Sequence, residues 1–409
     1  MLLIPAVRRT WAGTASMVLA ALAAAAAAAA LPQPVQAQNA PEAPADTSRP
    51  IEIEGKYIVD LIGVAAGGER RGTGVLDNAE LTADADLGRL VGWRGARAHV
   101  HLLSNYGRAT NMLAGTVQGI DNIEVTEGRT KLYEVWVEQM FAGDRAGLLV
   151  GLSDLNADFY QNDSAGMLIA PAFGIGSELA STGPNGPSIF PSTALTARLN
   201  VAVGKSGYVR AAVVAARAGV LGDASGIDFS MRDGALLIAE AGTTRGGKLA
   251  VGAWRYTRRQ DDLFALDAAG NPLRRIATGA YLLVDQRVAG NDARGVELFL
   301  RAGISEGQTT PFRGGFQSGV LVRGYVPGRP DGQFAFGVAQ GVLSHCFRAT
   351  LRAAGSDPSS AETGFEISYQ DRVAPWLSVQ PDVQYIDRAY AESGQRGTLV
   401  LGFRMIAEF

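Results

Sequence analysis

The chain has 409 residues, of which 47% are hydrophobic, and it carries a formal net charge of -3. A slightly negative chain lacks the excess of lysine and arginine that nucleic-acid-binding proteins carry, so nucleic acid is not an expected partner. A single cysteine, Cys346, excludes an internal disulfide framework and a cysteine-rich metal site, and three histidines leave little room for acid–base or metal chemistry.

The N-terminal segment 1–37 is predicted to be a signal peptide. Arg8 and Arg9 supply a positive start, the run 17–31 is apolar, and small residues near 35–37 offer a cleavage site. A transmembrane anchor is the alternative, but the run is short and consists mostly of alanine. The signal therefore predicts export to the periplasm.

Two further units follow the signal. Residues 38–54 are polar and rich in proline, which predicts a flexible periplasmic linker. Residues 55–409 contain no apolar window of about twenty residues, so helical membrane spans are not expected. This region instead repeats a pattern with a period of two, which is typical of β-strands.

The stretch Leu76 to Leu87 shows the pattern most clearly. Its polar set is Asn78, Glu80, Thr82, Asp84 and Asp86, and its apolar set is Ala79, Leu81, Ala83, Ala85 and Leu87. The pattern recurs in about sixteen segments, an even number that suits an antiparallel outer-membrane barrel. These segments are 55–64, 76–87, 95–105, 131–141, 146–154, 193–203, 206–216, 234–242, 247–257, 279–289, 294–304, 315–324, 333–343, 362–371, 376–387 and 397–409.

The links between these segments alternate in length. Short links such as 142–145 and 204–205 alternate with long ones such as 106–130 and 155–192. Outer-membrane barrels have short periplasmic turns and longer extracellular loops. The alternation therefore predicts an all-β fold, a transmembrane antiparallel up-and-down barrel whose charged parity faces a wet lumen. A soluble β-sandwich or jelly roll has the same period, but neither requires the alternation of link lengths.

The last strand alternates up to a terminal aromatic residue, Phe409. Leu399, Leu401, Phe403 and Met405 share its parity. Such an ending resembles the signal by which the barrel-assembly machinery recognises its clients, and it predicts insertion into the outer membrane of a Gram-negative bacterium.

Several stretches, taken in order, resemble the carbohydrate-selective outer-membrane porins of the OprB type. They are GVLDNAELTADADLGRLVGWRGARAHVHLLSNYG, TKLYEVWVEQMF, LLVGLSDLNADFYQNDSAGMLIAPAFG, GAYLLVDQRV, RGYVPGRPDGQFAFGVAQ and VAPWLSVQPDVQYI with the terminal strand. The resemblance implies a sixteen-stranded channel that passes sugars by diffusion and is narrowed by inward-folded loops. It assigns no individual sugar ligand.

Candidate residues for such a channel follow from parity and link length. The pore-lining candidates are Glu80, Asp84, Arg97, His99, Glu134, Trp136, Glu138, Arg198, Arg210, Asp285, Arg301 and Gln380. The longest link, about 155–191, is expected to fold into the lumen, and its constriction candidates are Phe159, Tyr160, Asp163, Phe173 and Glu178. Acids and arginines together favour neutral solutes over strong ion selectivity. The resemblance supplies the solute class, and it implies passive, substrate-selective diffusion of mono- and small oligosaccharides.

Other interpretations remain open at this point. The barrel could pass small organic acids or general solutes, or it could be a plugged structural or adhesive barrel. An enzyme is not expected, because a lipid hydrolase would need a serine or threonine nucleophile beside a histidine at the lipid face, whereas His99 and His101 share the lumen parity and His345 lies in a predicted loop. His99 and His101 could bind a metal, but without a cysteine nearby they are interpreted as ordinary wall, so neither a metal nor a cofactor is expected. Outer-membrane lipid and lipopolysaccharide are the expected surroundings, with a homotrimer possible.

Overall fold

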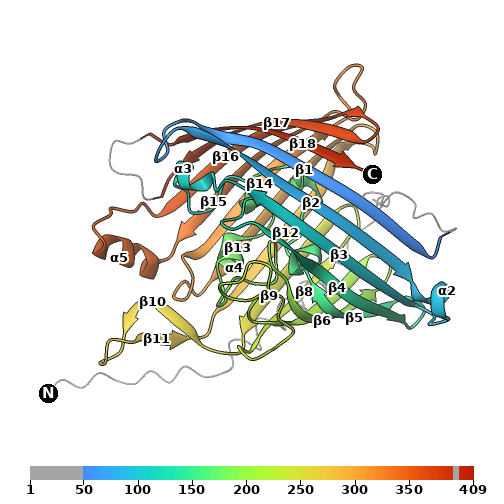
Figure 1. Ribbon diagram of the computed structural model, residues 1–409, viewed down its shortest axis with the longest axis horizontal. Helices are drawn as coiled ribbons and strands as arrows, with labels where there is room; N and C mark the ends of the chain where they lie inside the picture. The colour runs from blue at the N-terminus through green and yellow to red at the C-terminus, as the bar shows by residue number, and fades with distance from the viewer. Residues whose placement is uncertain (1–48, 390–395) are drawn as a thin grey trace.

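The structure is a computed structural model that describes residues 49–389 and 396–409. Sixteen strands form one closed barrel in which sequence neighbours pair, except that β9 pairs with β12 because β10 and β11 form a separate sheet (Figure 1). The fold prediction is confirmed. The predicted signal peptide and the linker residues 38–48 lie outside the described residues, and residues 51–54, assigned above to the linker, already belong to β1.

The barrel strands follow one another along the chain, and the helices, the 3-10 turns and the strands β10 and β11 lie in the links between them. The barrel strands are β1 (Ile51–Ala66), β2 (Gly72–Asp86), β3 (Ala96–Gly107), β4 (Arg129–Phe141), β5 (Ala146–Ser153), β6 (Ala194–Val203), β7 (Gly207–Ala215), β8 (Ala235–Thr243), β9 (Lys248–Tyr256), β12 (Thr278–Gly290), β13 (Gly295–Ser305), β14 (Phe312–Arg323), β15 (Gln333–Leu343), β16 (Ala361–Ala374), β17 (Leu377–Asp387) and β18 (Thr398–Glu408). The remaining elements are β10 (Gln260–Leu266), β11 (Pro272–Arg275), α2 (Leu87–Val91), α3 (Asn111–Ala114), α4 (Ser177–Ala180), α5 (His345–Ala353) and the 3-10 turns η1 (Leu155–Ala157), η2 (Asp163–Ala165) and η3 (Pro171–Phe173).

The barrel closes between its first and last strands. β1 pairs antiparallel with β18 from Lys56 opposite Glu408 to Val64 opposite Val400. This closure leaves no strand edge exposed, and every strand backbone can bond to a neighbour on each side. Among the described residues, no helix is long and apolar enough to span a membrane.

The period of two separates an apolar exterior from a polar interior. On β2, Leu81 is 47% exposed, whereas Asn78 on the other parity is 1% exposed. On β18, Leu401, Phe403 and Met405 are exposed, whereas Arg404 is buried. Exposed aliphatic and aromatic side chains around a closed barrel match the lipid-facing band of an outer-membrane protein.

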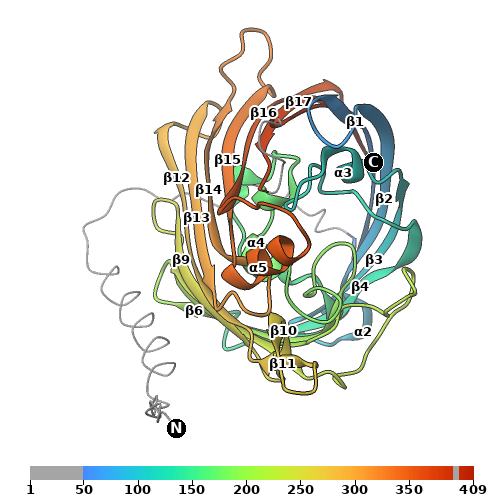
Figure 2. The same cartoon turned by 90° about the vertical axis from the view of Figure 1, so that its left-hand side faces the viewer.

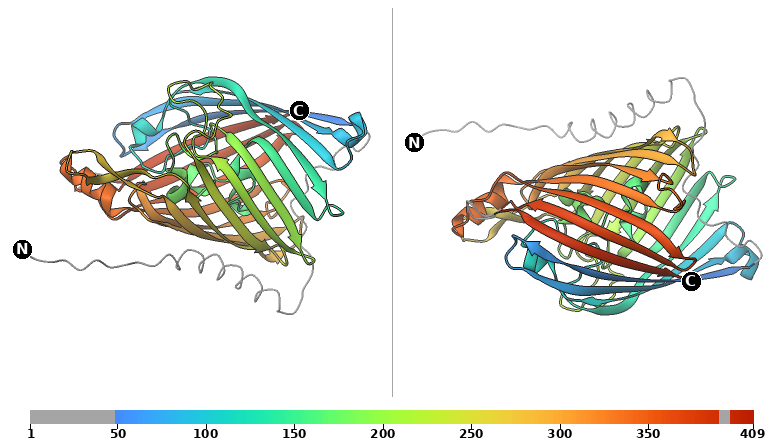
Figure 3. Two further views of the ribbon diagram at one scale, coloured as in Figure 1. Left: turned by 90° about the horizontal axis from the view of Figure 1, so that it is seen from below. Right: turned by 90° about the horizontal axis from the view of Figure 1, so that it is seen from above.

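The links lie at two opposite rims. The links after β3, β5, β7, β9 and β15 (108–128, 154–193, 216–234, 257–277 and 344–360) lie at what we call the long-link rim. The turns 142–145, 204–206, 244–247 and 291–294 lie at the opposite rim together with α2 and the C-terminus. Figure 3 shows α5 and the β10–β11 hairpin at one end of the barrel and α2 at the other. The hairpin lies outside the barrel sheet, within a link for which the period-two pattern predicts no strand.

One irregularity changes the parity predicted for β4. His101 pairs with Glu134 and Leu102 pairs with Leu132, which leaves Tyr133 as an extra residue in a β-bulge. Strict alternation with the inward-facing Glu134 and Trp136 predicts that Tyr133 faces outward. In the structure it is 4% exposed, and its hydroxyl donates a hydrogen bond to Asp154 Oδ2 over 2.5 Å.

Candidate functional site

The link 154–193 lies against the inner wall of the barrel. In Figure 2, which looks along the barrel from the long-link rim, α4 appears within the ring of strands. The link contains three 3-10 turns and one short helix, so most of its backbone groups cannot bond within a regular element. Buried backbone polar groups need partners, and side chains of the wall supply several of them.

Arg301 on β13 is the most heavily bonded of these wall residues. Its guanidinium donates to the carbonyl oxygens of Tyr160 (2.8 Å), Ala172 (2.7 Å) and Gly174 (2.9 Å), and its Nε donates to Gln317 Oε1 (2.8 Å). Arg301 is 1% exposed. The planar five-donor group of arginine suits this task, because it can hold several acceptors in one fixed geometry.

The strands β16 and β17 bind the next part of the link. The carboxylate of Glu366 accepts hydrogen bonds from the backbone nitrogens of Ile169 and Ala170, the latter over 2.9 Å. The Gln380 amide donates to the carbonyl of Met167 over 2.6 Å. A carboxylate takes only donors and an amide can donate to a carbonyl, so each wall residue matches the backbone group it faces.

Charged wall residues bind the first part of the link. Arg198 on β6 forms ion pairs with Asp158 at 2.9 Å and with Glu138 at 2.6 Å. Arg210 on β7 donates to the carbonyl of Asp158 and lies 3.6 Å from its carboxylate. Asp285 on β12 accepts hydrogen bonds from the backbone nitrogen and the hydroxyl of Ser164. The link is therefore bound to strands on several sides of the barrel.

Tyr160 lies at the centre of an aromatic cluster between the link and the wall. Its ring stacks on Tyr281 with centroids 3.6 Å apart, and its hydroxyl accepts a hydrogen bond from Trp254 Nε1 over 2.9 Å. The same hydroxyl donates to Glu178 Oε1 over 3.1 Å. Burial raises the pKa of the Glu178 carboxyl, although Arg301 and Tyr160 partly oppose the rise.

The link 108–128 also contacts the inner wall. Glu362 on β16 accepts hydrogen bonds from the backbone nitrogens of Val117 and Gln118, and Gln384 on β17 donates to the carbonyl of Ile120 over 2.8 Å. Parity places Glu362 and Gln384 on the inner face, but no sequence signal indicates that a second link bonds to them.

The predicted pore-lining residues all lie on the inner face, where they fall into two groups. Glu138, Arg198, Arg301 and Gln380 are buried, and Arg198, Arg301 and Gln380 bind the link 154–193. The others keep partial or full exposure, although Glu134, Arg210 and Asp285 also bond to the link. This second group is Glu80, Asp84, Arg97, His99, Glu134, Trp136, Arg210 and Asp285. Of the link candidates, Phe159, Tyr160, Phe173 and Glu178 are buried and Asp163 is exposed. Parity predicts the face of a residue, but it cannot predict which inner positions a link covers.

The strands β2, β3 and β4 carry neighbouring inner residues that keep partial or full exposure. Asp84 Oδ1 lies 2.9 Å from His99 Nδ1. The His99 ring stacks on Trp136 with centroids 4.9 Å apart, and the Arg97 guanidinium lies 5.5 Å from the Trp136 ring centroid. The side chains of Arg97 and Asp84 are 58% and 54% exposed. This surface, which we call the β2–β4 polar face, combines charged hydrogen-bonding groups with planar rings.

Gly337 on β15 makes room for the link. A Cβ atom at this position would lie 2.5 Å from Phe173 Cε1 and 2.6 Å from Leu168 Cδ1, and both side chains are buried. We expect Gly337→Ala to lower the free energy of unfolding by about 1–3 kcal/mol, because the added methyl group overpacks this contact. Denaturant unfolding in lipid vesicles measures the change.

Gly364 on the neighbouring strand β16 is the matched control. A Cβ atom there would meet only Ile386 Cγ1, at 3.7 Å, which is an ordinary contact. Gly364→Ala should be neutral or stabilise the protein by about 0.5–1 kcal/mol, because alanine loses less chain entropy on folding than glycine. Equal effects of the two substitutions would contradict the packing of the link against Gly337.

Comparison with known proteins adds to this geometry. A family model described as the carbohydrate-selective porin, OprB family, matches residues 70–409. The high-pH structure of Pseudomonas putida OprB is similar to the chain with a TM-score of 0.78 and 19% identity, over 88% of this chain and 94% of that one. The outer membrane channel DcaP of Acinetobacter baumannii is similar with a TM-score of 0.54 and 11% identity, over 88% and 97%. A comparison with the curated proteins gives no match.

The structural similarity and the family match support different conclusions. The solved structures are less than 25% identical to the chain, so they support the fold alone. The family model covers most of the chain, which includes all but the first of the barrel strands. The chain therefore belongs to the carbohydrate-selective porins of the OprB family, and it is a channel protein of the outer membrane.

Proposed function

We propose that this chain is a channel for passive, substrate-selective diffusion of mono- and small oligosaccharides through a water-filled lumen narrowed by the link 154–193. The observation that carries the proposal is the β2–β4 polar face. Arg97 and Asp84 offer exposed charged groups that exchange hydrogen bonds with sugar hydroxyls. The Arg97 guanidinium lies beside the Trp136 ring and the Asp84 carboxylate beside the His99 ring, so each charged group adjoins a planar surface.

The mixture of charges supports neutral solutes. The polar face contains the acids Glu80, Asp84 and Glu134 as well as Arg97, so it carries both negative and positive charges. A neutral polyol can use both donors and acceptors, whereas an organic acid is repelled by the carboxylates. Binding should remain weak, since a channel must release its solute as readily as it captures it.

Several properties of the surroundings belong to the same proposal. We expect segment 1–37 to be removed on export through the periplasm and the terminal strand with Phe409 to be the signal for barrel assembly. Lipopolysaccharide would contact the exposed aliphatic exterior at the long-link rim. A homotrimer is one possible assembly of such barrels in the membrane.

Current block by sugars in planar lipid bilayers tests the function directly. We expect open channels whose conductance falls when glucose or maltose is added. Conductance blocked by small organic acids but by no sugar would favour the organic-acid alternative. The absence of any conductance from folded protein would indicate a plugged barrel. Liposome swelling with a panel of sugars then ranks the substrates by size.

Arg97 provides a sharper test of the polar face. We expect Arg97→Gln to weaken sugar block about twofold to tenfold, because a charged donor in a wet lumen adds only part of the strength of a charge-assisted hydrogen bond. The dependence of block on sugar concentration gives this ratio. Arg94→Gln, three residues away in an exposed turn, is the control and should leave the block unchanged. Equal sugar block in the unaltered protein, Arg97→Gln and Arg94→Gln would contradict a role of the β2–β4 polar face in sugar binding.

A further inference from the structure

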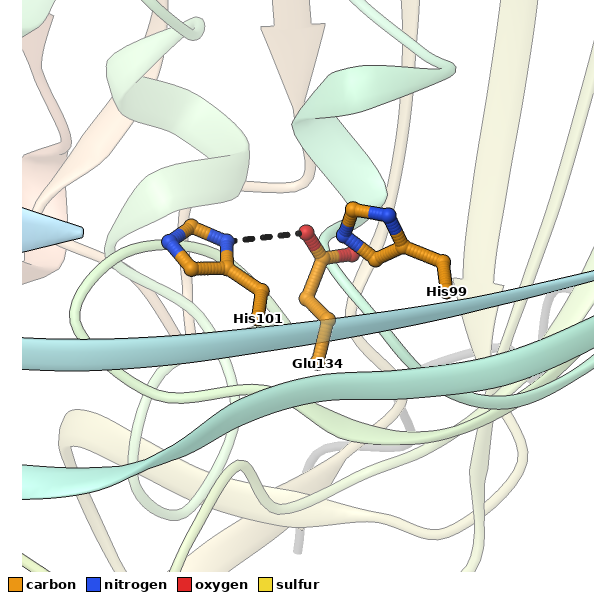
Figure 4. A group of neighbouring side chains, drawn as sticks. All are labelled: His99, His101 and Glu134. Atoms are coloured by element: carbon orange, nitrogen blue, oxygen red, sulfur yellow. Dashed lines mark hydrogen bonds and ion pairs between the residues drawn. The ribbon is translucent and has the colours of Figure 1, made fainter. Parts of the chain in front are cut away.

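Two histidines and a glutamate meet on the inner face of β3 and β4. His99 and His101 lie two residues apart on β3, and the antiparallel pairing places Glu134 directly opposite His101. One ligand atom from each side chain lies within 4.8 Å of the others. Figure 4 shows the carboxylate of Glu134 between the two imidazole rings. The sequence offered only the two histidines, and the strand register supplies the third group.

The atoms that face the centre of this cluster are suitable metal ligands. His101 Nδ1 lies 3.5 Å from Glu134 Oε2, and a ring nitrogen of His99 faces the same carboxylate (Figure 4). Ligand atoms about 2.1 Å from a tetrahedral zinc ion lie about 3.4 Å from one another. Small rotations of the three side chains would therefore close the cluster around an ion. Imidazole nitrogen with one carboxylate suits Zn²⁺, Ni²⁺ or Cu²⁺ rather than Mg²⁺.

Neighbouring groups orient all three side chains. Asp84 Oδ1 lies 2.9 Å from His99 Nδ1, so in the tautomer that carries the proton on Nδ1 the carboxylate accepts a hydrogen bond from it and the other ring nitrogen of His99 is left for an ion. Glu134 Oε1 accepts a hydrogen bond from the backbone nitrogen of Asp154 over 2.7 Å, so Oε2 is the oxygen that faces the histidines. A carboxylate behind a histidine ligand is the usual supporting arrangement in metal sites.

His101 is the most informative member of the cluster. It is 9% exposed, and its Nε2 has no hydrogen-bond partner within the described residues. The nearest carboxylate, Glu80 Oε2, is 3.7 Å away, beyond hydrogen-bond distance. A purely structural histidine would be expected to satisfy both nitrogens when buried. A bound ion at Nδ1 would draw the ring into place and polarise the Nε2 proton toward Glu80.

We propose that His99, His101 and Glu134 form a binding site for a divalent transition-metal ion of the zinc class on the inner wall of the channel. The three protein ligands leave a fourth position for water. The site adjoins Arg97 and Trp136 on the polar face, so an ion there would add positive charge and a fixed water to the surface that solutes pass. The effect on solute passage rests on the function proposed above, whereas the binding itself does not.

Direct titration of the detergent-solubilised full chain with ZnCl₂ tests the binding. We expect one zinc ion per chain by isothermal titration calorimetry and no binding of MgCl₂ under the same conditions. His101→Gln, His99→Gln and Glu134→Gln should each weaken zinc binding about 100-fold or more, and Asp84→Asn should weaken it about tenfold. His345→Gln alters the third histidine of the chain, which lies on α5, and should bind zinc as the unaltered protein does.

The variants distinguish zinc binding at this site from non-specific zinc binding and from misfolding of the protein. Zinc binding that is absent from the unaltered protein, or equal in all variants, would overturn the proposal. Heat-dependent migration on gels verifies that each variant is a closed barrel. Zinc-dependent change of single-channel current in the unaltered protein, lost in His101→Gln, would link the site to conduction. Zinc binding without any sugar block would leave the site intact and count against the sugar channel alone.

Discussion

Replacement of Arg301 by methionine is expected to at least double the single-channel conductance and to make the open current noisy. Arg301 is the donor for the carbonyls of Tyr160, Ala172 and Gly174. Methionine keeps much of the side-chain volume but offers no donor. Each buried carbonyl left without a partner costs about 1–3 kcal/mol, so three of them make the bound position of the link unfavourable.

The link can escape this cost because the proposed lumen is wet. If it moves away from β13, water satisfies the three carbonyls, so we expect the substitution to widen the channel rather than to unfold the barrel. Sugar block should weaken at the same time, since solutes would pass the polar face at a greater distance. Planar-bilayer recording measures both quantities on the same channel.

Arg352→Met is the matched control for this experiment. Arg352 is exposed on α5, a helix at the long-link rim whose Thr350 donates a hydrogen bond to the carbonyl of Leu263 on β10. The control should conduct as the unaltered protein does. If Arg301→Met conducts at the normal level with normal noise, the guanidinium is not what holds the link in place.

Replacement of Arg404 by methionine is expected to lower the free energy of unfolding by about 3–5 kcal/mol. Arg404 on β18 donates two hydrogen bonds to Asp60 Oδ2 and Oδ1, over 2.6 and 2.8 Å, and the two residues are opposite each other where the barrel closes. A third bond, over 2.7 Å, reaches Asn122 Oδ1 in the link 108–128. Asp60 and Arg404 are buried, and the buried Asp121 carboxylate lies 3.5 Å from the same guanidinium, so removing Arg404 leaves buried carboxyl groups without their partner.

A double substitution distinguishes the ion pair from simple loss of packing. Asp60→Asn with Arg404→Met removes both charges, and it should be more stable than Arg404→Met alone, because an unpaired buried charge costs more than an absent pair. Lys56 lies on the same strand as Asp60 and is in no ion pair within residues 49–389 and 396–409, so Lys56→Met should change stability by less than about 0.5 kcal/mol. Denaturant unfolding followed by tryptophan fluorescence gives the three values. A double substitution less stable than the single one would contradict this account.

The prediction of the fold succeeded because its signals are local. Each of the sixteen predicted segments overlaps a barrel strand, since alternation of side chains with a period of two is written into every strand separately. The bulge at Tyr133 is the exception on β4. An inserted residue reverses the parity of what precedes it, and the run of residues around Tyr133 contains no glycine or proline to mark the insertion.

The candidate site could be predicted only in part. The alternating pattern places Arg97, His99 and Arg301 on the inner face, but it does not show which of them the link covers. The structure separates them, because Arg301 is covered by the link and Arg97 is not. This difference depends on the path of the link, and residues such as Glu366 and Gly337 that receive it are far from it in the chain.

The sequence by itself determined that this protein is a closed barrel with a polar inner face and an apolar outer face, since burial of alternate residues depends on each strand's own pattern. Only the tertiary structure decided which inner residues bind the two links and which remain exposed. It also decided that Glu134 meets His99 and His101. These outcomes depend on strand register and on hydrogen bonds between distant segments, which no local pattern encodes.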